Sequence, residues 1–290
     1  MFTGAMVALI TPFHEGEIDF KTLDELVNFQ LENGIDAIAP VGTTGECPTL
    51  SHEEHKKVIE RVVRAVGGRV PVIAGAGSNS TAEAIDLTSF SKKVGADATL
   101  QVGPYYNKPT QEGFYQHFKT IAEEVDLPMV LYNIPGRCGA GLTVDTIVRL
   151  AEIENIVGIK EASGSLDMAS EIAVRCDLTI LSGDDSLTLP IASVGGKGVI
   201  SVVANIVPAD VKAMTDLILE GDFTSARQWH NKLFTLCRNL LGLATNPIPI
   251  KAAMAMLNLA SEEMRLPMTT LDEDKKTRLR QTLKEYGLLD

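Results

Sequence analysis

Short apolar runs alternate with amphipathic stretches over about the first 220 residues, and this alternation constrains the fold more than any other feature. Eight apolar runs have the length of buried strands: Val7–Ile10, Ala37–Val41, Val72–Ala74, Ala98–Val102, Met129–Tyr132, Ile156–Ile159, Thr179–Leu181 and Gly198–Val203. The stretches between them, such as Lys21–Asn33 and Glu53–Val66, have helical periodicity. Strands that alternate with helices form βαβ units, so the pattern predicts a parallel sheet.

Eight such strands match the size of a closed (β/α)8 TIM barrel, which typically needs roughly 250 residues. An open doubly wound sheet is the alternative. From about Thr224 to Asp290 no strand pattern occurs, and three helices are indicated, with Asn246-Pro247-Ile248-Pro249 breaking the chain between the first two. We therefore expect an α/β protein with a catalytic barrel at residues 1–223 and a C-terminal helical extension at residues 224–290.

Composition limits the partners and the compartment. The net charge of −12 argues against nucleic acid and against an anionic membrane surface, because both require basic patches. The four cysteines are far apart and form no CxxC pair, which indicates reduced thiols in a cytosolic protein. Residues Met1–Val7 lack the basic region of a signal peptide, and no apolar run has the length of a membrane span. We expect a soluble, cytoplasmic protein.

Lys160 directly follows the apolar run Ile156–Ile159, so it is expected at the end of a buried strand. Burial makes an ammonium costly and favours the neutral amine. A neutral amine attacks carbonyl groups and forms a Schiff base. A lysine that extends from a strand end into solvent is the alternative explanation, and the neighbouring side chains must decide between the two.

Polar side chains also follow the other strands, whose carboxyl ends share the catalytic rim of a (β/α)8 barrel. These segments are Gly42-Thr43-Thr44-Gly45-Glu46, Gly103-Pro104-Tyr105-Tyr106-Asn107, Tyr132-Asn133-Ile134-Pro135-Gly136-Arg137, Ser182-Gly183-Asp184-Asp185 and Ile200-Ser201. Tyrosines, hydroxyls, an arginine and a lysine thus converge on one rim. This convergence indicates an active site more strongly than any single motif does.

Each segment also has a structural explanation. Gly42–Gly45 is either a simple turn or a nest of N–H groups and hydroxyls that holds a carboxylate. Tyr132 either fills the core or moves protons one strand away from Lys160. Arg137 is either a solvated charge or a bidentate partner of a carboxylate.

Two further patterns are interpreted as structural. His52 and His55 lack the HExxH pattern of zinc sites, and Ser51–Glu54 has the capping-box pattern of a helix start. The glycine-rich segments at residues 75–77 and 195–198 match neither a dinucleotide fingerprint nor a P-loop. We therefore expect no metal site and no nucleotide.

Three motifs together resemble the pyruvate-dependent class I aldolase family, which includes N-acetylneuraminate lyase; they are Gly42-Thr43-Thr44-Gly45-Glu46, Tyr132-Asn133-Ile134-Pro135-Gly136-Arg137 and Gly158-Ile159-Lys160-Glu161. The similarity is closest to the dihydrodipicolinate synthase branch and covers essentially the whole chain. It implies condensation of pyruvate with L-aspartate 4-semialdehyde through a lysine Schiff base, giving 4-hydroxy-tetrahydrodipicolinate for lysine (diaminopimelate) biosynthesis. It implies no cofactor, since the lysine acts as the electron sink.

The resemblance also implies roles for the residues that match the family's motifs. Lys160 would form the Schiff base with pyruvate, and Thr43 and Thr44 would hold the pyruvate carboxylate. Tyr132 would move protons at the Schiff base. Thr44 would link Tyr132 to Tyr106, which in the family reaches in from the neighbouring subunit.

By the same resemblance, Arg137 would bind the carboxylate of the aldehyde substrate, and Gly183 and Ile200 would line the pocket. A sugar-acid aldolase such as N-acetylneuraminate lyase is the alternative; those relatives usually lack an arginine at position 137 and often carry serine in place of Thr43. A non-catalytic sensor of a 2-oxo acid is an alternative from another class. Retention of both the lysine and the tyrosine argues against it.

The family is mostly tetrameric, as a pair of tight dimers, so we expect a homotetramer. In lysine-regulated relatives the effector L-lysine binds at the tight-dimer interface. The matching positions here are His52, His55, Asn79, Glu83 and Tyr105. We expect L-lysine to bind there, with an affinity weakened by Cys47 and Pro48, which stand where regulated relatives often carry small residues.

Overall fold

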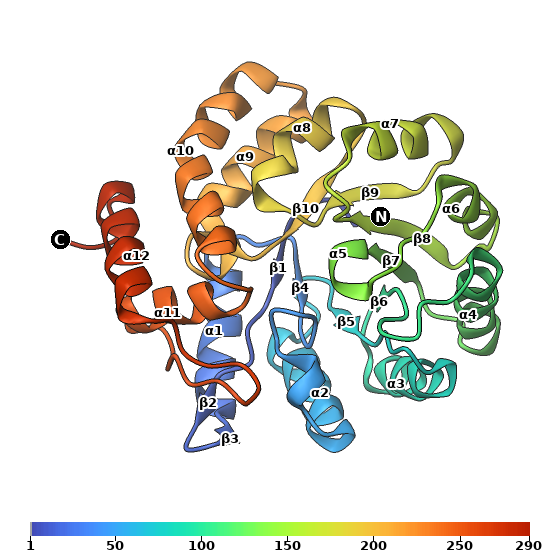
Figure 1. Cartoon of the computed structure of the whole chain (residues 1–290), viewed down its shortest axis with the longest axis horizontal. Coiled ribbons are helices and arrows are strands. Elements are labelled where there is room, and N and C mark those ends of the chain that lie inside the picture. The colour runs from blue at the N-terminus through green and yellow to red at the C-terminus, as the bar shows by residue number, and fades with distance from the viewer. Residues whose placement is uncertain (1) are drawn as a thin grey trace.

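The computed structural model describes residues 2–290 and has the predicted architecture, a TIM barrel of eight parallel strands surrounded by helices (Figure 1). The barrel strands are β1 (Gly4–Ala8), β4 (Ala37–Ala39), β5 (Ile73–Gly75), β6 (Ala98–Val102), β7 (Met129–Asn133), β8 (Ile156–Glu161), β9 (Thr179–Ser182) and β10 (Gly198–Ser201). Their order is β4-β1-β10-β9-β8-β7-β6-β5, and a parallel bridge between Ile38 and Val72 joins the two ends. This bridge closes the ring, so the open doubly wound sheet was the wrong alternative.

The helices that follow the strands surround the barrel (Figure 1). They are α1 (Phe20–Glu32), α2 (His52–Val66), α3 (Thr81–Val94), α4 (Gln111–Glu124), α5 (Pro135–Cys138), α6 (Val144–Ala151), α7 (Leu166–Arg175), α8 (Thr188–Ser193) and α9 (Pro208–Glu220). Helix α2 begins with the predicted capping box, in which the Ser51 hydroxyl and the Glu54 carboxylate each accept the other residue's N–H. Among residues 2–290, no helix combines the length and apolarity needed to cross a bilayer.

Apolar side chains fill the interior of the barrel. Met6, Ile73, Val130 and Leu181 belong to one buried cluster contributed by strands on different sides of the ring. A barrel packed in this way is a core and not a pore. A ligand therefore does not bind inside the barrel, and the polar side chains begin at the rim, where the strands end.

Several strands end before their predicted ranges do: β4 ends at Ala39 instead of Val41, and the first and last strands also end early. Strand β1 ends at Ala8, although Leu9 and Ile10 continue the apolar run, and β10 ends at Ser201. The side chain of Asn205 explains this difference, because it accepts the N–H of Ile10 (3.2 Å) and donates to the carbonyl of Ala8 (2.8 Å). Buried backbone groups are thus satisfied without strand pairing.

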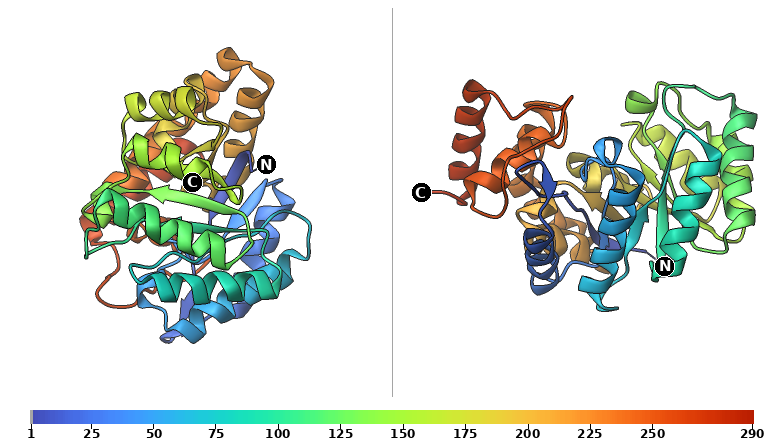
Figure 2. Two further views of the ribbon diagram at one scale, coloured as in Figure 1. Left: turned by 90° about the vertical axis from the view of Figure 1, so that its right-hand side faces the viewer. Right: turned by 90° about the horizontal axis from the view of Figure 1, so that it is seen from below.

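The C-terminal extension has the three predicted helices: α10 (Phe223–Gly242), α11 (Ile248–Met256) and α12 (Glu273–Tyr286). Leu233, Leu236 and Leu240 of α10 belong to the same apolar core as Val199 of β10. Helices α11 and α12 lie at one side of the molecule, where α12 packs on α10 and α11 (Figures 1 and 2). The segment between α11 and α12 contacts the short hairpin β2 (Phe13–His14)–β3 (Glu17–Ile18) at Gly16. The extension is therefore packed onto the barrel, and a boundary at residue 223 stays a prediction.

Candidate active site

A cavity of about 330 Å³ opens at the rim of the barrel. It brings together six of the residues that the sequence singled out: Thr43, Thr44, Tyr132, Arg137, Lys160 and Gly183. These residues come from loops and strand ends that are far apart along the chain. Closure of the ring places them around one space, as the rim argument predicts.

Lys160 lies at the carboxyl end of β8, directly opposite Tyr132 of β7 in the strand register. Its side chain is only 5% exposed, and its Nζ lies 4.3 Å from the centre of the Tyr132 ring. Burial lowers the pKa of Lys160 to about 8; the charge of Asp185 opposes this shift, and that of Arg137 adds to it. The drop from 10.5 increases the neutral fraction at pH 7 by roughly two to three orders of magnitude.

Gly183 leaves room for this lysine. A Cβ at position 183 would lie 3.2 Å from Cε of Lys160 and 2.6 Å from Cβ of Ala162. Any larger side chain would therefore displace the amine or its strand. Gly183 lines the cavity because of this close approach.

Asp185 is a buried acid whose charge acts on Lys160 and for which the sequence indicated no role. Its carboxylate accepts hydrogen bonds from the Ser201 hydroxyl and from the N–H groups of Val202 (2.9 Å) and Val203 (3.3 Å). Burial raises the pKa of Asp185, and these hydrogen bonds oppose the increase. An acid in the segment after a strand was the available signal, but only the fold brings it near Lys160.

The loop after β4 presents Thr43 and Thr44 to the cavity. The loop turns tightly, since a Cβ at Gly45 would lie 2.9 Å from the backbone nitrogen of Val41. Thr44 is 2% exposed, and its hydroxyl accepts a hydrogen bond from Nδ2 of Asn246 (3.0 Å). Two hydroxyls and the loop's N–H groups thus border the space in front of the amine.

Tyr132 is buried beside this loop. Burial raises the pKa of Tyr132 to about 12, while the charge of Arg137 and a hydrogen bond with the Thr43 side chain oppose the increase. The phenol therefore stays protonated and can donate or relay a proton. In the single chain its hydroxyl neighbour is Thr43, and a relay from Thr44 to Tyr106 stays a prediction.

The C-terminal extension contributes to the cavity, which the sequence analysis did not predict. Leu241, Thr245 and Asn246 line it together with the rim residues. Arg137, on the short helix α5, donates from its guanidinium to the carbonyl of Asn246 (2.9 Å). Because more than 100 residues separate Asn246 from both Arg137 and Thr44, sequence spacing held no signal for this contact.

Two predicted residues do not line the cavity in the single chain. Ile200 is 1% exposed and packs inside the barrel with Tyr132 and Leu181; Val202, just beyond the strand, borders the cavity instead. Tyr106 is 90% exposed and has a φ of 72°, a backbone conformation that is unfavourable for a bulky residue. It does not line its own chain's cavity.

A second cavity, of about 120 Å³, contains four of the five predicted effector residues: His52, His55, Glu83 and Tyr105. Ser78 also lines it, and its hydroxyl donates to the Glu83 carboxylate (2.7 Å). Asn79 does not line this cavity; its amide donates to the carbonyl of Tyr105 (3.0 Å) and supports that residue. Nε2 of His55 hydrogen-bonds the carbonyl of Gly75 (2.7 Å), and burial lowers the pKa of this histidine.

The described part of the chain, residues 2–290, has no group of three or more His, Cys, Asp or Glu side chains arranged to hold a metal ion. His52 and His55 thus belong to the second cavity and not to such a group. The rim has the parts needed for amine chemistry on a carbonyl compound: a buried amine, a protonated phenol, hydroxyls and one guanidinium.

Comparison with known proteins agrees with this chemistry. A family model described as the dihydrodipicolinate synthetase family matches residues 1–286. The 4-hydroxy-tetrahydrodipicolinate synthase of Syntrophobacter fumaroxidans is 53% identical over 292 residues, covering 100% of both chains. The dihydrodipicolinate synthase of Acinetobacter baumannii, solved with pyruvate, matches at a TM-score of 0.97 and 45% identity over 100% of both chains. The enzyme of Cyanidioschyzon merolae, solved with lysine bound, matches at 0.96 and 44% over 99% of each.

The lowered pKa of Lys160 predicts how its reactivity depends on pH. Trace labelling with acetic anhydride, followed by mass spectrometry of the peptide that contains Lys160, should give a half-maximal rate near pH 8 and not near 10.5. In Asp185→Asn the midpoint should move lower, because a negative charge that favours the ammonium is removed. A midpoint near 10.5 in the unmodified protein would contradict burial of the amine.

Proposed function

The chain belongs to the dihydrodipicolinate synthetase family, and on that premise we propose which of its residues carry out the family's reaction. The chain condenses pyruvate with L-aspartate 4-semialdehyde and gives 4-hydroxy-tetrahydrodipicolinate, a step in lysine (diaminopimelate) biosynthesis. The observation that carries the residue assignment is the buried amine of Lys160, with a pKa of about 8, inside the rim cavity.

The neutral amine of Lys160 attacks the keto carbon of pyruvate, and loss of water gives the Schiff base. Loss of a methyl proton converts the imine into an enamine, whose carbon attacks the aldehyde of the second substrate. The amine of that substrate then displaces Lys160, which closes the ring and frees the enzyme. The lysine accepts and returns the electron pair in these steps.

Tyr132 and the threonine loop support these steps. The Tyr132 phenol is protonated at neutral pH, and its ring lies 4.3 Å from Nζ of Lys160. It donates a proton to the hydroxyl that leaves as water when the Schiff base forms, and it is reprotonated afterwards. Thr43 and Thr44 bind the pyruvate carboxylate through their hydroxyls and the N–H groups of their loop. The relative from Acinetobacter baumannii that was solved with pyruvate supports this site.

Arg137 selects the second substrate. Its guanidinium is at the cavity and is held by the carbonyl of Asn246, with further donors left for a carboxylate. L-Aspartate 4-semialdehyde has a carboxylate at the end that must point away from the reacting aldehyde. A sugar acid has hydroxyl groups there instead, so the arginine favours the aldehyde over the substrate of an N-acetylneuraminate lyase.

Borohydride trapping tests the assignment of Lys160 and Arg137 together. With pyruvate, one pyruvate-derived mass should appear on the peptide that contains Lys160, and none in Lys160→Ala. Arg137→Ala should still be trapped, but its kcat/KM for the aldehyde should fall roughly 10- to 150-fold, as expected for loss of a charged contact. The surface variant Arg149→Ala is the control. A label on another lysine would overturn the mechanism, and cleavage of N-acetylneuraminate would favour the alternative aldolase.

The working unit is a tight dimer, two of which form a homotetramer. Tyr105 and Tyr106 project from the loop after β6 and are 39% and 90% exposed. Two exposed aromatic rings on one loop indicate a protein–protein interface. In a two-fold symmetric dimer the same loop of each subunit is buried against the other subunit. Tyr106 then completes the proton relay of the neighbouring subunit through Thr44.

Complementation between inactive subunits tests this arrangement. Tyr106→Phe and Lys160→Ala should each be inactive alone. A hybrid dimer of the two contains one site with every group intact, so about half of the wild-type activity per dimer should return. If hybrids verified by mass spectrometry stay inactive, Tyr106 does not work across the interface.

L-Lysine binds the second cavity as a feedback inhibitor. The Glu83 carboxylate pairs with an ammonium, and Tyr105, held through its backbone by Asn79, hydrogen-bonds the carboxylate. Cys47 lines this cavity and also a void of about 30 Å³ that reaches Thr43 and Tyr132, which provides a physical connection to the active site. The relative solved with lysine bound supports the proposal.

Inhibition assays test the effector site. L-Lysine should lower the activity and D-lysine should not, because the cavity is chiral. Glu83→Gln keeps the shape of the side chain but removes the charge, so it should raise the inhibitory concentration at least tenfold while leaving kcat unchanged. An enzyme that is indifferent to millimolar L-lysine would show that this cavity is structural only.

A cytoplasmic location completes the proposal. All four cysteines are free, and Cys138 and Cys237 are buried as thiols. Free thiols are typical of reducing compartments.

A further inference from the structure

A second buried lysine, Lys251 of α11, forms an ion pair with Glu46. Glu46 ends the Gly42–Glu46 loop, which carries Thr43 and Thr44. Lys251 is 0% exposed, and its ammonium donates to the carboxylate of Glu46, which is 2% exposed. The same ammonium donates to the carbonyl of Glu263 (2.8 Å) and lies 4.2 Å from the centre of the Phe13 ring. Neither charge takes part in the chemistry proposed above. Desolvation of two charges needs a reason, since an apolar pair of similar volume often serves stability equally well.

We infer that the Glu46–Lys251 pair is a positioning device: it anchors the Gly42–Glu46 loop to the C-terminal extension and so holds Thr43 and Thr44 where they bind the pyruvate carboxylate. The inference rests on the role proposed for these two threonines. It concerns residues that touch no substrate and act through the loop.

The geometry of the loop shows why an anchor is needed. Glu46 has a φ of 54°, a left-handed conformation that costs free energy in any residue with a side chain. Its N–H donates to the carbonyl of Thr43 (3.1 Å), so the position of Glu46 is tied directly to the threonines. A strained backbone persists only where its surroundings over-determine it. The buried carboxylate provides that constraint.

The extension holds the loop at two points. Asn246 donates to the hydroxyl of Thr44, and Lys251, five residues later, holds Glu46. The barrel holds the loop at a third point, where the hydroxyl of Thr11 donates to the carbonyl of Gly45 (2.7 Å). The extension therefore contacts Thr44 and Glu46, and the barrel contacts Gly45 between them.

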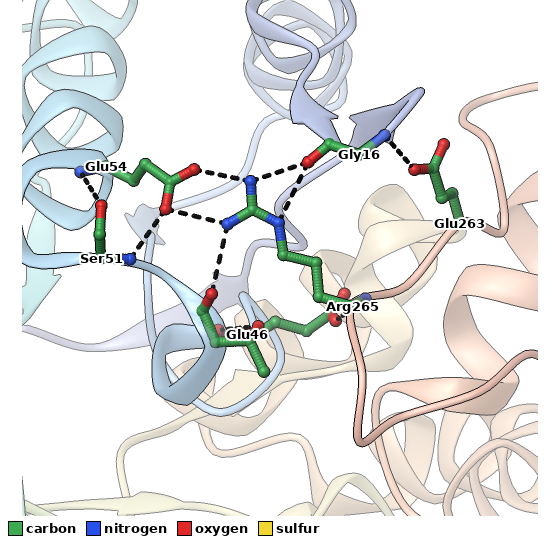
Figure 3. Close-up of polar contacts among 7 residues, drawn as sticks. Gly16, Glu46, Ser51, Glu54, Glu263 and Arg265 are labelled. Atoms are coloured by element: carbon green, nitrogen blue, oxygen red, sulfur yellow. Dashed lines mark hydrogen bonds and ion pairs between the residues drawn. The ribbon is translucent and has the colours of Figure 1, made fainter.

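Arg265 fixes the segment that follows α11 in place. Its guanidinium donates to both oxygens of Glu54 (2.6 and 2.9 Å) and to the carbonyl of Gly16 (2.9 Å), as Figure 3 shows. Glu263, from the same segment, accepts the N–H of Gly16. The carbonyl of Glu263, which accepts a hydrogen bond from Lys251, is thus held against the β2–β3 hairpin and the start of α2. The anchor is rigid on the side of the extension as well.

A role in stability alone predicts a different pattern of kinetics. If the pair only stabilises the fold, a variant that is folded at the assay temperature binds pyruvate normally. If the pair positions the loop, pyruvate binding weakens in every variant that lacks it, whatever the stability. Removing both charges together separates the two effects, because the double variant leaves no unpaired buried charge.

The test compares Glu46→Gln, Lys251→Met and the double variant Glu46→Gln/Lys251→Met. Glutamine and methionine keep the approximate size of each side chain. Thermal unfolding, the KM for pyruvate, the KM for the aldehyde and borohydride trapping are measured for each protein. Tyr286→Phe is the matched control, because it removes a partly buried hydrogen bond between the extension and Asp210 of α9 that does not involve the Gly42–Glu46 loop.

The single variants should have a lower unfolding midpoint and a KM for pyruvate raised at least tenfold, with the KM for the aldehyde within about twofold of wild type. The double variant should regain unfolding midpoint, yet its KM for pyruvate should stay raised at least tenfold. Tyr286→Phe should lose stability and keep both KM values.

A double variant with the wild-type KM for pyruvate would overturn the inference, as would a KM that follows the unfolding midpoint across all four variants. If a single variant does not fold, the double variant still decides the question. Failure of the wild-type enzyme to be trapped with pyruvate at Lys160 would instead overturn the proposed function. The two failures are therefore distinguishable.

Discussion

Parallel backbone pairing runs from β4 around to β5, and the bridge between Ile38 and Val72 joins its ends. Because all the strands point the same way, this ring brings their carboxyl ends to one rim. Register within the ring sets the chemistry: Tyr132 lies opposite Lys160 because their strands pair at that step. A shift of one residue would turn the lysine to the other face of the sheet and remove the site. The packed barrel interior excludes a ligand from the centre, so the reaction takes place at the rim.

The two buried lysines show how pairing decides the role of a charge. Within the described residues, no carboxylate lies within salt-bridge distance of Lys160, and burial lowers the pKa of that amine to about 8. Lys251 is even more deeply buried, but it meets the carboxylate of Glu46 directly. Burial lowers the pKa of both amines, but at Lys251 the charge and the hydrogen bond of Glu46 oppose the decrease, so that this amine can act as an anchor. Lysine thus has two roles in this molecule: Lys160 reacts with the substrate, and Lys251 holds a loop in position.

The sequence predicted the elements better than their ends. Continuous apolar runs located all eight barrel strands, because such strands are buried on both faces, and helical patterns located the three helices of the extension. It extended β1 to Ile10, because an apolar run shows burial but not whether the backbone pairs. Asn205, almost 200 residues away, satisfies that backbone instead. Rim residues such as Lys160 and Thr44 were predictable, since the end of a strand is visible in the sequence.

The sequence by itself determined the fold class, the rim and the amine, because these depend on local periodicity and on which residue follows a strand. Only the tertiary structure decided the rest. It placed Asn246 against Thr44, buried Asp185 where its charge acts on Lys160, and brought Lys251 to Glu46 across 205 positions. It also left Tyr106 exposed and outside the lining of its own chain's cavity. Contacts of this kind join segments with no common period or spacing, so they exist only once the chain has folded and its extension has packed against the barrel.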